Sequence, residues 1–253
     1  MPPVFESPDP GLYELRDEHL EPRFLAARRA SSPEAWDAVA PPIGPPGLGL
    51  REVRVLTRDW CARLAEEVER IEAFHARHGI ALERPNSMNA YGLVLDRVGF
   101  APALRALVVR ELRPLAAHAF AAHGGATLDD HHGFVVDYAR GKDEELGFHV
   151  DDSEVTLNLC LAGDFVGSEL YIRGERCDLH RDTPARPDEA RELEHEPGVA
   201  ILHAGKQRHG VRPLEHGRRR SLIVWCRSTA VRAAPRAGGC PPWCGIARRR
   251  ADA

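Results

Sequence analysis

Long apolar segments are absent from this chain. No hydrophobic run in its 253 residues approaches the roughly 20 residues that a membrane-spanning helix needs. The opening Met1-Pro2-Pro3 also lacks the charged and apolar regions of a secretory signal peptide. We therefore expect neither membrane association nor secretion.

The chain also lacks an excess of charge of one sign. Its 34 basic and 38 acidic residues give a formal net charge of −4, which provides no electrostatic basis for binding nucleic acid. With 43% hydrophobic and 28% charged residues, the composition is that of a globular protein with one sizeable core. Nothing in the sequence fixes an oligomeric state.

Cysteine is scarce. The six thiols are scattered over positions 61, 160, 177, 226, 240 and 244, and three of them fall in apolar or helical contexts. We interpret them as mostly reduced thiols, which favours a cytoplasmic protein.

Two predicted helices occupy the first half of the chain. Thr57 is a suitable N-cap for a helix whose apolar residues recur at nearly helical spacing as far as Gly79. A second helix is predicted to begin at Pro102 and to end by Gly124. We expect this helical part, residues 51–125, to pack on a sheet.

Both ends of the chain differ from this pattern. Residues 1–50 are rich in proline and charge, and although residues 12–30 can form a helix, the proline- and glycine-rich residues 41–47 cannot continue one. We therefore predict an N-terminal extension and linker over residues 1–50. Few core residues follow Arg227, so residues 230–253 are predicted to be a peripheral tail.

From Gly133 onward the apolar pattern changes to a period of two, which is typical of strands. We predict a fold that is mostly β with flanking helices, in which residues 126–229 form a closed or double-sheet architecture of the jelly-roll type. A polar insert over residues 173–197 interrupts the strands. We expect an exposed loop there, with a lid as the alternative.

One short stretch carries recognisable chemistry: Gly147-Phe148-His149-Val150-Asp151-Asp152. Residues i and i+2 of an extended strand project from the same face, so the His149 imidazole and the Asp151 carboxylate should converge. A further imidazole would complete a two-histidine, one-carboxylate set that leaves about three positions open on an octahedral ion. That set suits Fe(II), because the open positions can hold a chelating cosubstrate together with O2.

His-x-Asp is a weak signal by itself, since 13 His and 16 Asp in 253 residues give roughly one occurrence by chance. A second copy, His180-Arg181-Asp182, lies in the polar insert without a strand pattern. His149 instead precedes the alternating run of residues 155–161, and this context selects the first copy.

The second histidine should lie downstream, near the end of another strand. His180 and His195 fall in the polar insert and are interpreted as solvated surface imidazoles, whereas His203 ends an apolar strand. His209 lies ten residues ahead of Arg219, and an arginine there can bind the far carboxylate of a dicarboxylate through two parallel N–H···O bonds. The ten-residue spacing to Arg219 favours His209 as the second histidine.

Several stretches together resemble the Fe(II)/2-oxoglutarate dioxygenases of the prolyl-hydroxylase type. Those that carry metal and cosubstrate motifs are residues 147–151 (GFHVD), 209–213 (HGVRP), 217–219 (GRR) and 222–225 (LIVW). Those outside the motifs are residues 84–92, 134–138, 154–158 and 228–232. The resemblance spans about residues 55–232.

The resemblance implies a cupin-like double-stranded β-helix over a dioxygenase domain of residues 51–229, with bound Fe(II), 2-oxoglutarate and O2 as cosubstrates, and ascorbate support. It implies oxidative decarboxylation of 2-oxoglutarate to succinate and CO2, coupled to hydroxylation of a C–H bond. The substrate implied is a prolyl or lysyl side chain of a peptide, or a related amino acid.

Individual site residues follow from the same resemblance. It makes His149, Asp151 and His209 the iron ligands, and it places the arginine for the C5 carboxylate of 2-oxoglutarate two residues after a glycine, at Arg219. Tyr138 resembles the family tyrosine that hydrogen-bonds the cosubstrate, although a half-buried strand tyrosine would look the same.

Two further features stay open at the sequence level. If the strand face of Asn158 looks into the barrel, its side chain needs a polar partner, either cosubstrate or substrate. The family's C-terminal cysteine pair is echoed by Cys240 and Cys244, but their spacing is looser, so we expect a disordered tail there rather than a zinc knuckle.

Two other functions are compatible with these motifs. A cupin-like metal-dependent isomerase or hydrolase would use the same three ligands but would not need Arg219. A non-catalytic β-barrel binding module would bind its ligand without metal or would lack one of the metal ligands.

Overall fold

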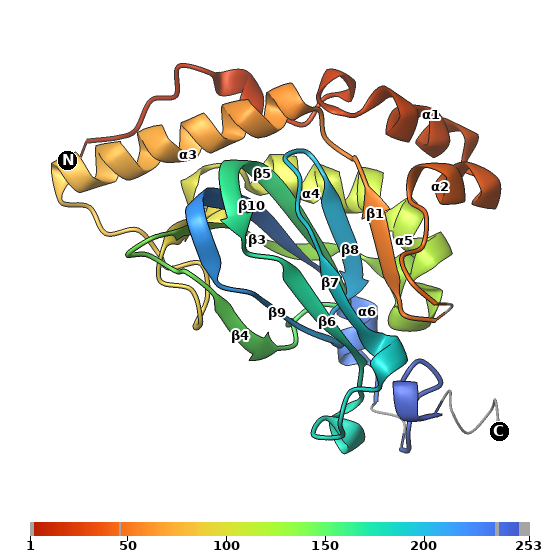
Figure 1. Ribbon diagram of the computed structural model, residues 1–253. Helices are drawn as coiled ribbons and strands as arrows, with labels where there is room; N and C mark the ends of the chain where they lie inside the picture. The colour runs from red at the N-terminus through yellow and green to blue at the C-terminus, as the bar shows by residue number, and fades with distance from the viewer. Residues whose placement is uncertain (1–2, 46, 236–237, 248–253) are drawn as a thin grey trace.

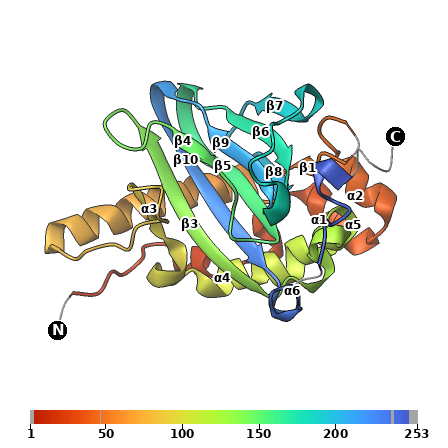
Figure 2. The ribbon, with the colours of Figure 1, turned by 90° about the horizontal axis from the view of Figure 1, so that it is seen from below.

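The computed structural model describes residues 3–45, 47–235 and 238–247. Within them, ten strands form two antiparallel sheets, and helices cover the outer face of the larger sheet (Figures 1 and 2). No helix in these residues is both long enough and apolar enough to cross a bilayer. Pro46 of the predicted linker, and residues 236–237 and 248–253 of the predicted tail, lie outside the described ranges.

The chain passes back and forth between the two sheets from β3 to β10, which is the arrangement of a double-stranded β-helix and confirms the predicted fold. The larger sheet contains, in spatial order, β1 (Leu50–Val53), β8 (Ala200–Ala204), β5 (Val155–Gly167), β10 (Leu214–Arg227), β3 (Asp130–Ala139) and β2 (Gly92–Val94). The smaller sheet contains, in spatial order, β4 (Leu146–His149), β9 (Gln207–Val211), β6 (Leu170–Glu175) and β7 (Ala190–Leu193).

Alternation along the strands separates two hydrophobic cores. In β3, Val135 packs into the core between the larger sheet and the helices. Its neighbours Phe134, Val136 and Tyr138 pack into the second core, between the two sheets. Side chains on the inner sheet faces are therefore shielded by both sheets.

The helices agree in part with the sequence prediction. The Thr57 side chain accepts a hydrogen bond from the Trp60 N–H at 3.2 Å, and α3 (Arg58–His78) ends at Gly79, whose φ is 64°. Figure 1 shows α3 lying across the larger sheet, where it contacts β5. The second predicted helix is divided into α4 (Ala101–Ala106), a π-helical segment (Leu107–Leu112) and α5 (Arg113–Ala119), and a short α6 (Thr229–Ala233) follows β10.

The N-terminal segment is not the extension and linker that we predicted. It forms α1 (Pro22–Ala30) and α2 (Pro33–Val39), and the side chains of Leu12, Phe24 and Trp36 are at most 2% exposed within the helix-side core. Both helices begin with a proline, at a position where the missing N–H removes no intrahelical bond. The prolines therefore mark helix starts, and the segment belongs to the domain.

The polar insert, residues 173–197, is not an exposed loop either. Its strand β7 pairs with β6 at the edge of the smaller sheet. Arg176 and Glu189, which are 2% and 4% exposed, form a bidentate ion pair with N–O distances of 2.7 and 2.8 Å. The insert is held by polar side chains that pair with one another, so it shows no apolar pattern in the sequence.

Three consecutive arginines of β10 point alternately to opposite faces of the sheet. Arg218 donates to both carboxylate oxygens of Asp137 at 2.7 Å, and Arg220 donates to Glu72 of α3 at 2.7 Å. Arg219 has no solvent exposure and lies on the inner face, opposite Tyr138 in the β3–β10 ladder. Strand alternation thus separates Arg219 from its neighbours, as the sequence predicts.

We predict that Asp137→Asn lowers the free energy of unfolding by about 3 kcal/mol at pH 7, because it leaves Arg218 and Lys142 without their buried anionic partner. Burial raises the pKa of the Asp137 carboxyl, but hydrogen bonds from Arg218 and Lys142 outweigh it and hold the pKa below its usual 3.8. The ion-pair stabilisation is therefore complete at neutral pH and is lost as the pH falls below about 4.

Urea unfolding at pH 7 and at pH 3 measures both effects. The difference between wild type and Asp137→Asn should shrink at the lower pH. Arg16→Ala, which removes an exposed pair with Glu14, is the control and should cost less than about 1 kcal/mol. Equal losses in the two variants would show that Asp137 is not a stabilising centre.

Candidate functional site

The candidate site lies between the two sheets, where β4 meets β9. His149 and His209 are direct cross-strand partners, and their ring centroids are 4.2 Å apart. Asp151 follows β4 by two residues, with Oδ1 3.5 Å from His149 Nε2 and Oδ2 3.8 Å from His209 Nε2. The structure thus brings these three predicted residues together, and their ligand atoms all lie within 4.8 Å of one another.

Backbone carbonyls orient both imidazoles. The Nδ1 atoms of His149 and His209 lie 2.8 and 2.9 Å from the carbonyl oxygen two residues earlier in the chain. A carbonyl only accepts, so each Nδ1 carries the proton and each Nε2 keeps its lone pair. Asp151 is held in turn by Thr156, whose hydroxyl donates to Oδ2 at 2.7 Å.

The electrostatics agree with a metal-ligand set. Burial lowers the pKa of His209 to about 3. Burial would raise the pKa of the Asp151 carboxyl, but the surrounding imidazoles outweigh it and hold that pKa well below its usual range. Burial also lowers the pKa of His149, yet the contact with Asp151 outweighs it and the net shift is upward, so a metal would compete with a proton there.

His203 on β8 is a close neighbour of this group. It has no solvent exposure, its Nε2 is 3.8 Å from Asp151 Oδ2, and this nitrogen has no hydrogen-bond partner within the described ranges. Its ring centroid is 4.6 Å from that of His209. It is not, however, one of the three residues whose ligand atoms all lie within 4.8 Å of one another.

A cavity of about 250 Å³ opens beside His149, Asp151 and His209. Tyr138 and Asn158, the two residues considered as cosubstrate contacts, both line it. Asn158 is 5% exposed, and its Oδ1 has no hydrogen-bond partner in the described part of the chain. The rest of the inner lining is mainly apolar: Phe134, Val136, Leu146, Val211, Ile223 and Trp225.

Arg219 does not itself line the cavity, but it adjoins Tyr138, which does. Its guanidinium carbon lies 4.6 Å from the Tyr138 ring centroid. Its Nη1 donates to the Ser168 carbonyl and, at 3.0 Å, to His195 Nδ1, whereas its buried Nε has no partner among the described residues. A fully buried guanidinium with an unused donor is unusual and fits an anion site.

Two histidines of the insert lie elsewhere than we predicted. His195 is only 6% exposed, and burial together with the Arg219 charge lowers its pKa well below 6.5, so a neutral ring accepts the Arg219 hydrogen bond. His180 is half-buried beside the Cys177 thiol. Neither contact could be predicted from the sequence, because both residues stand in a polar segment without a periodic pattern.

Two apolar side chains of the cavity lining are partly exposed to solvent. Met88 and Val150 are 46% and 37% exposed. The Asn86 side chain accepts hydrogen bonds from the N–H groups of Met88 and Asn89 at 2.7 and 2.8 Å, which fixes the loop that forms one wall. The sequence marks residues 84–92 only through the family resemblance, because an irregular polar stretch has no periodicity from which a structure can be predicted.

Comparisons with known proteins agree with this geometry. The family model described as an OGFOD2-like domain matches residues 4–125. The chain is 42% identical over 211 residues to "2-oxoglutarate and iron-dependent oxygenase domain-containing protein CP2" of Arabidopsis thaliana, covering 83% of this chain and 53% of that protein. It is 39% identical over 236 residues to human "2-oxoglutarate and iron-dependent oxygenase domain-containing protein 2", covering 88% and 63%.

This chain therefore spans between half and two thirds of the length of these relatives. A solved structure of a prolyl 4-hydroxylase from Phytophthora capsici shares the fold, with a TM-score of 0.51 and 14% identity over 87% of this chain and 70% of that one. The domain match and these relatives thus show that the chain is similar to 2-oxoglutarate and iron-dependent oxygenase domain-containing proteins over most of its length.

Proposed function

We propose that this protein is an Fe(II)- and 2-oxoglutarate-dependent dioxygenase that hydroxylates a C–H bond of its substrate. The observation that carries the proposal is the convergence of His149, Asp151 and His209 in the lining of one cavity. The names of the curated relatives support the same two cofactors.

The donor set fits Fe(II), since two imidazole nitrogens and one carboxylate oxygen leave open positions on an octahedral ion. Iron bound there, with 2-oxoglutarate and O2, supplies oxidative decarboxylation to succinate and CO2 coupled to hydroxylation. The protein's own part is orientation. Backbone carbonyls hold the two histidines, and Thr156 holds Asp151.

The buried polar groups around the cavity fit 2-oxoglutarate. Arg219 provides a positive charge without solvent exposure, and Tyr138 both lines the cavity and packs against that charge. A carboxylate that reaches Tyr138 is therefore stabilised by the guanidinium in a low-dielectric setting. Asn158, whose Oδ1 has no partner within the described ranges, would contribute its amide to the cosubstrate or the substrate.

For the substrate, we propose a prolyl or lysyl side chain of a peptide, or a related amino acid. The exposed apolar side chains of Met88 and Val150, which line the cavity, offer a surface on which an extended peptide can lie. We also propose that ascorbate supports turnover and, from six free thiols, that the protein works in the cytoplasm.

The test is succinate release after anaerobic Fe(II) reconstitution, with a panel of prolyl and lysyl peptides and free amino acids. We expect one substrate class to raise succinate release above the uncoupled rate and to gain one oxygen atom per succinate. Iron-loaded protein that consumes no 2-oxoglutarate with any substrate would favour a cupin-like isomerase or hydrolase.

We predict that His209→Ala weakens Fe(II) binding by more than about 100-fold, because loss of a ligand should exceed the 10- to 100-fold cost of losing a supporting contact. His203→Ala is the matched control, since His203 is equally close to Asp151 but lies outside the group of three. Anaerobic metal titration measures both. The reverse result would make His203 the distal ligand.

We predict that Arg219→Ala weakens 2-oxoglutarate binding by about 30-fold or more, since losing one partner of a desolvated charge pair costs about 2–5 kcal/mol. Arg219→Lys should also weaken binding, because it keeps the charge but loses the planar fork. Arg218→Ala and Arg220→Ala are controls that remove contacts to Asp137 and to α3. Anaerobic Kd measurements decide; a large effect at a control with none at Arg219 would disprove the assignment.

A further inference from the structure

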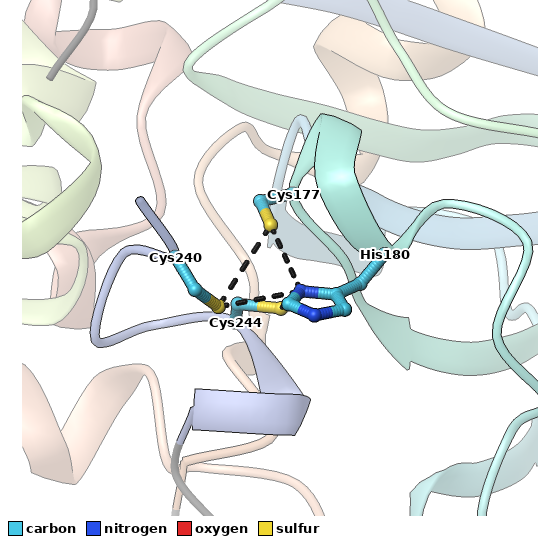
Figure 3. Close-up of side chains that lie close together, drawn as sticks. All are labelled: Cys177, His180, Cys240 and Cys244. Carbon is cyan, nitrogen blue, oxygen red and sulfur yellow. Dashed lines mark hydrogen bonds between the residues drawn. The ribbon is translucent and has the colours of Figure 1, made fainter. Parts of the chain in front are cut away.

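Four potential metal ligands from two distant parts of the chain converge away from the cavity. Cys177 and His180 belong to the turn after β6, and Cys240 and Cys244 belong to the C-terminal segment 238–247 (Figure 3). Their ligand atoms all lie within 4.8 Å of one another. Figure 3 shows the three sulfur atoms and the imidazole pointing toward a common centre.

The distances match tetrahedral coordination. Zinc bonds of about 2.3 Å to sulfur and about 2.0–2.1 Å to nitrogen place two sulfur ligands about 3.8 Å apart, and a sulfur and a nitrogen about 3.6 Å apart. Here Cys177 Sγ and Cys240 Sγ are 3.9 Å apart. His180 Nδ1 lies 3.3, 3.4 and 3.7 Å from the sulfur atoms of Cys177, Cys240 and Cys244.

Two simpler explanations fit less well. A disulfide needs a sulfur–sulfur distance near 2.05 Å, and the Cys177–Cys240 separation is almost twice that. A solvated tail would leave its thiols exposed, yet Cys244 has no exposure and Cys240 is half-buried. The prediction of a disordered tail is therefore wrong for residues 238–247, and so is the prediction of a solvated His180.

The backbone around the cluster is also fixed. Arg186 donates to the Gly245 carbonyl at 2.6 Å, and the Trp243 ring lies 5.2 Å from that of His123. A Cβ atom at Gly245 would lie 2.3 Å from Glu189 Oε1 and 2.5 Å from Arg176 Nη1. The C-terminal segment thus packs directly on the buried ion pair of the insert, and only glycine fits at this contact.

We infer that Cys177, His180, Cys240 and Cys244 bind one Zn²⁺ ion that ties the C-terminal segment to the insert after β6. Three thiolates and one imidazole are the soft donor set that zinc prefers, and four protein ligands leave no position for substrate. The site is therefore structural. It differs in donor chemistry from the imidazole–carboxylate set of His149, so the chain separates two metals by ligand type.

Metal analysis of the purified full chain tests the inference. We expect one zinc per chain that survives gel filtration, and we expect Cys177→Ser and Cys244→Ser to lose it. His180→Cys should keep the ion, because a fourth thiolate can replace the imidazole. Cys61→Ala, which removes a buried thiol of α3, and His149→Ala, which alters the candidate iron site, are controls that should both keep zinc.

Two further measurements, cobalt spectroscopy and hydrogen exchange, do not depend on enzyme activity. Co²⁺ in place of zinc should give the intense visible bands of a tetrahedral thiolate site in the wild type and in His180→Cys. Chelation should raise hydrogen exchange in residues 238–247 while the sheets stay protected. Folded, reduced protein without zinc and without these cobalt bands, or a Cys177–Cys240 disulfide found by mass spectrometry, would overturn the inference.

Discussion

The pairing of β4 with β9 is the constraint on which the candidate site depends. It places His149 directly opposite His209, although sixty residues separate the two along the chain. Asp151 then needs only the short turn out of β4 to reach both rings. The three side chains are oriented by backbone carbonyls and by Thr156, so the geometry is set by the fold itself.

The larger sheet supports this arrangement through strict alternation of β10. Arg218 and Arg220 form ion pairs toward the helices, while Arg219 enters the space between the sheets with no exposure. Burial of an isolated guanidinium is costly, and here the Ser168 carbonyl, the neutral His195 ring and the Tyr138 face share that cost. The Nε donor, which has no partner among the described residues, fits an anionic ligand.

Features that depend on neighbouring residues could be predicted from the sequence. The Thr57 cap follows from helix-capping preferences, and the alternation around Arg219 follows from strand periodicity. His149 and Asp151 converge as predicted, although Asp151 lies beyond the end of β4 rather than on it. Contacts between polar residues far apart in the chain could not. The Arg219–His195 bond and the four-residue thiol–imidazole cluster lack any apolar pattern. The proline-rich composition of residues 1–50 suggested an extension, although Pro22 and Pro33 begin helices that pack on the core.

The central claim is that one cavity holds Fe(II) and 2-oxoglutarate together, and an anaerobic titration tests it most directly. Iron-loaded protein titrated with 2-oxoglutarate should develop a weak visible charge-transfer band that saturates at one cosubstrate per iron. The same addition should raise the Tm, since a ligand that binds only the folded state stabilises it. Tightly bound iron with no band and no change in Tm would contradict the account.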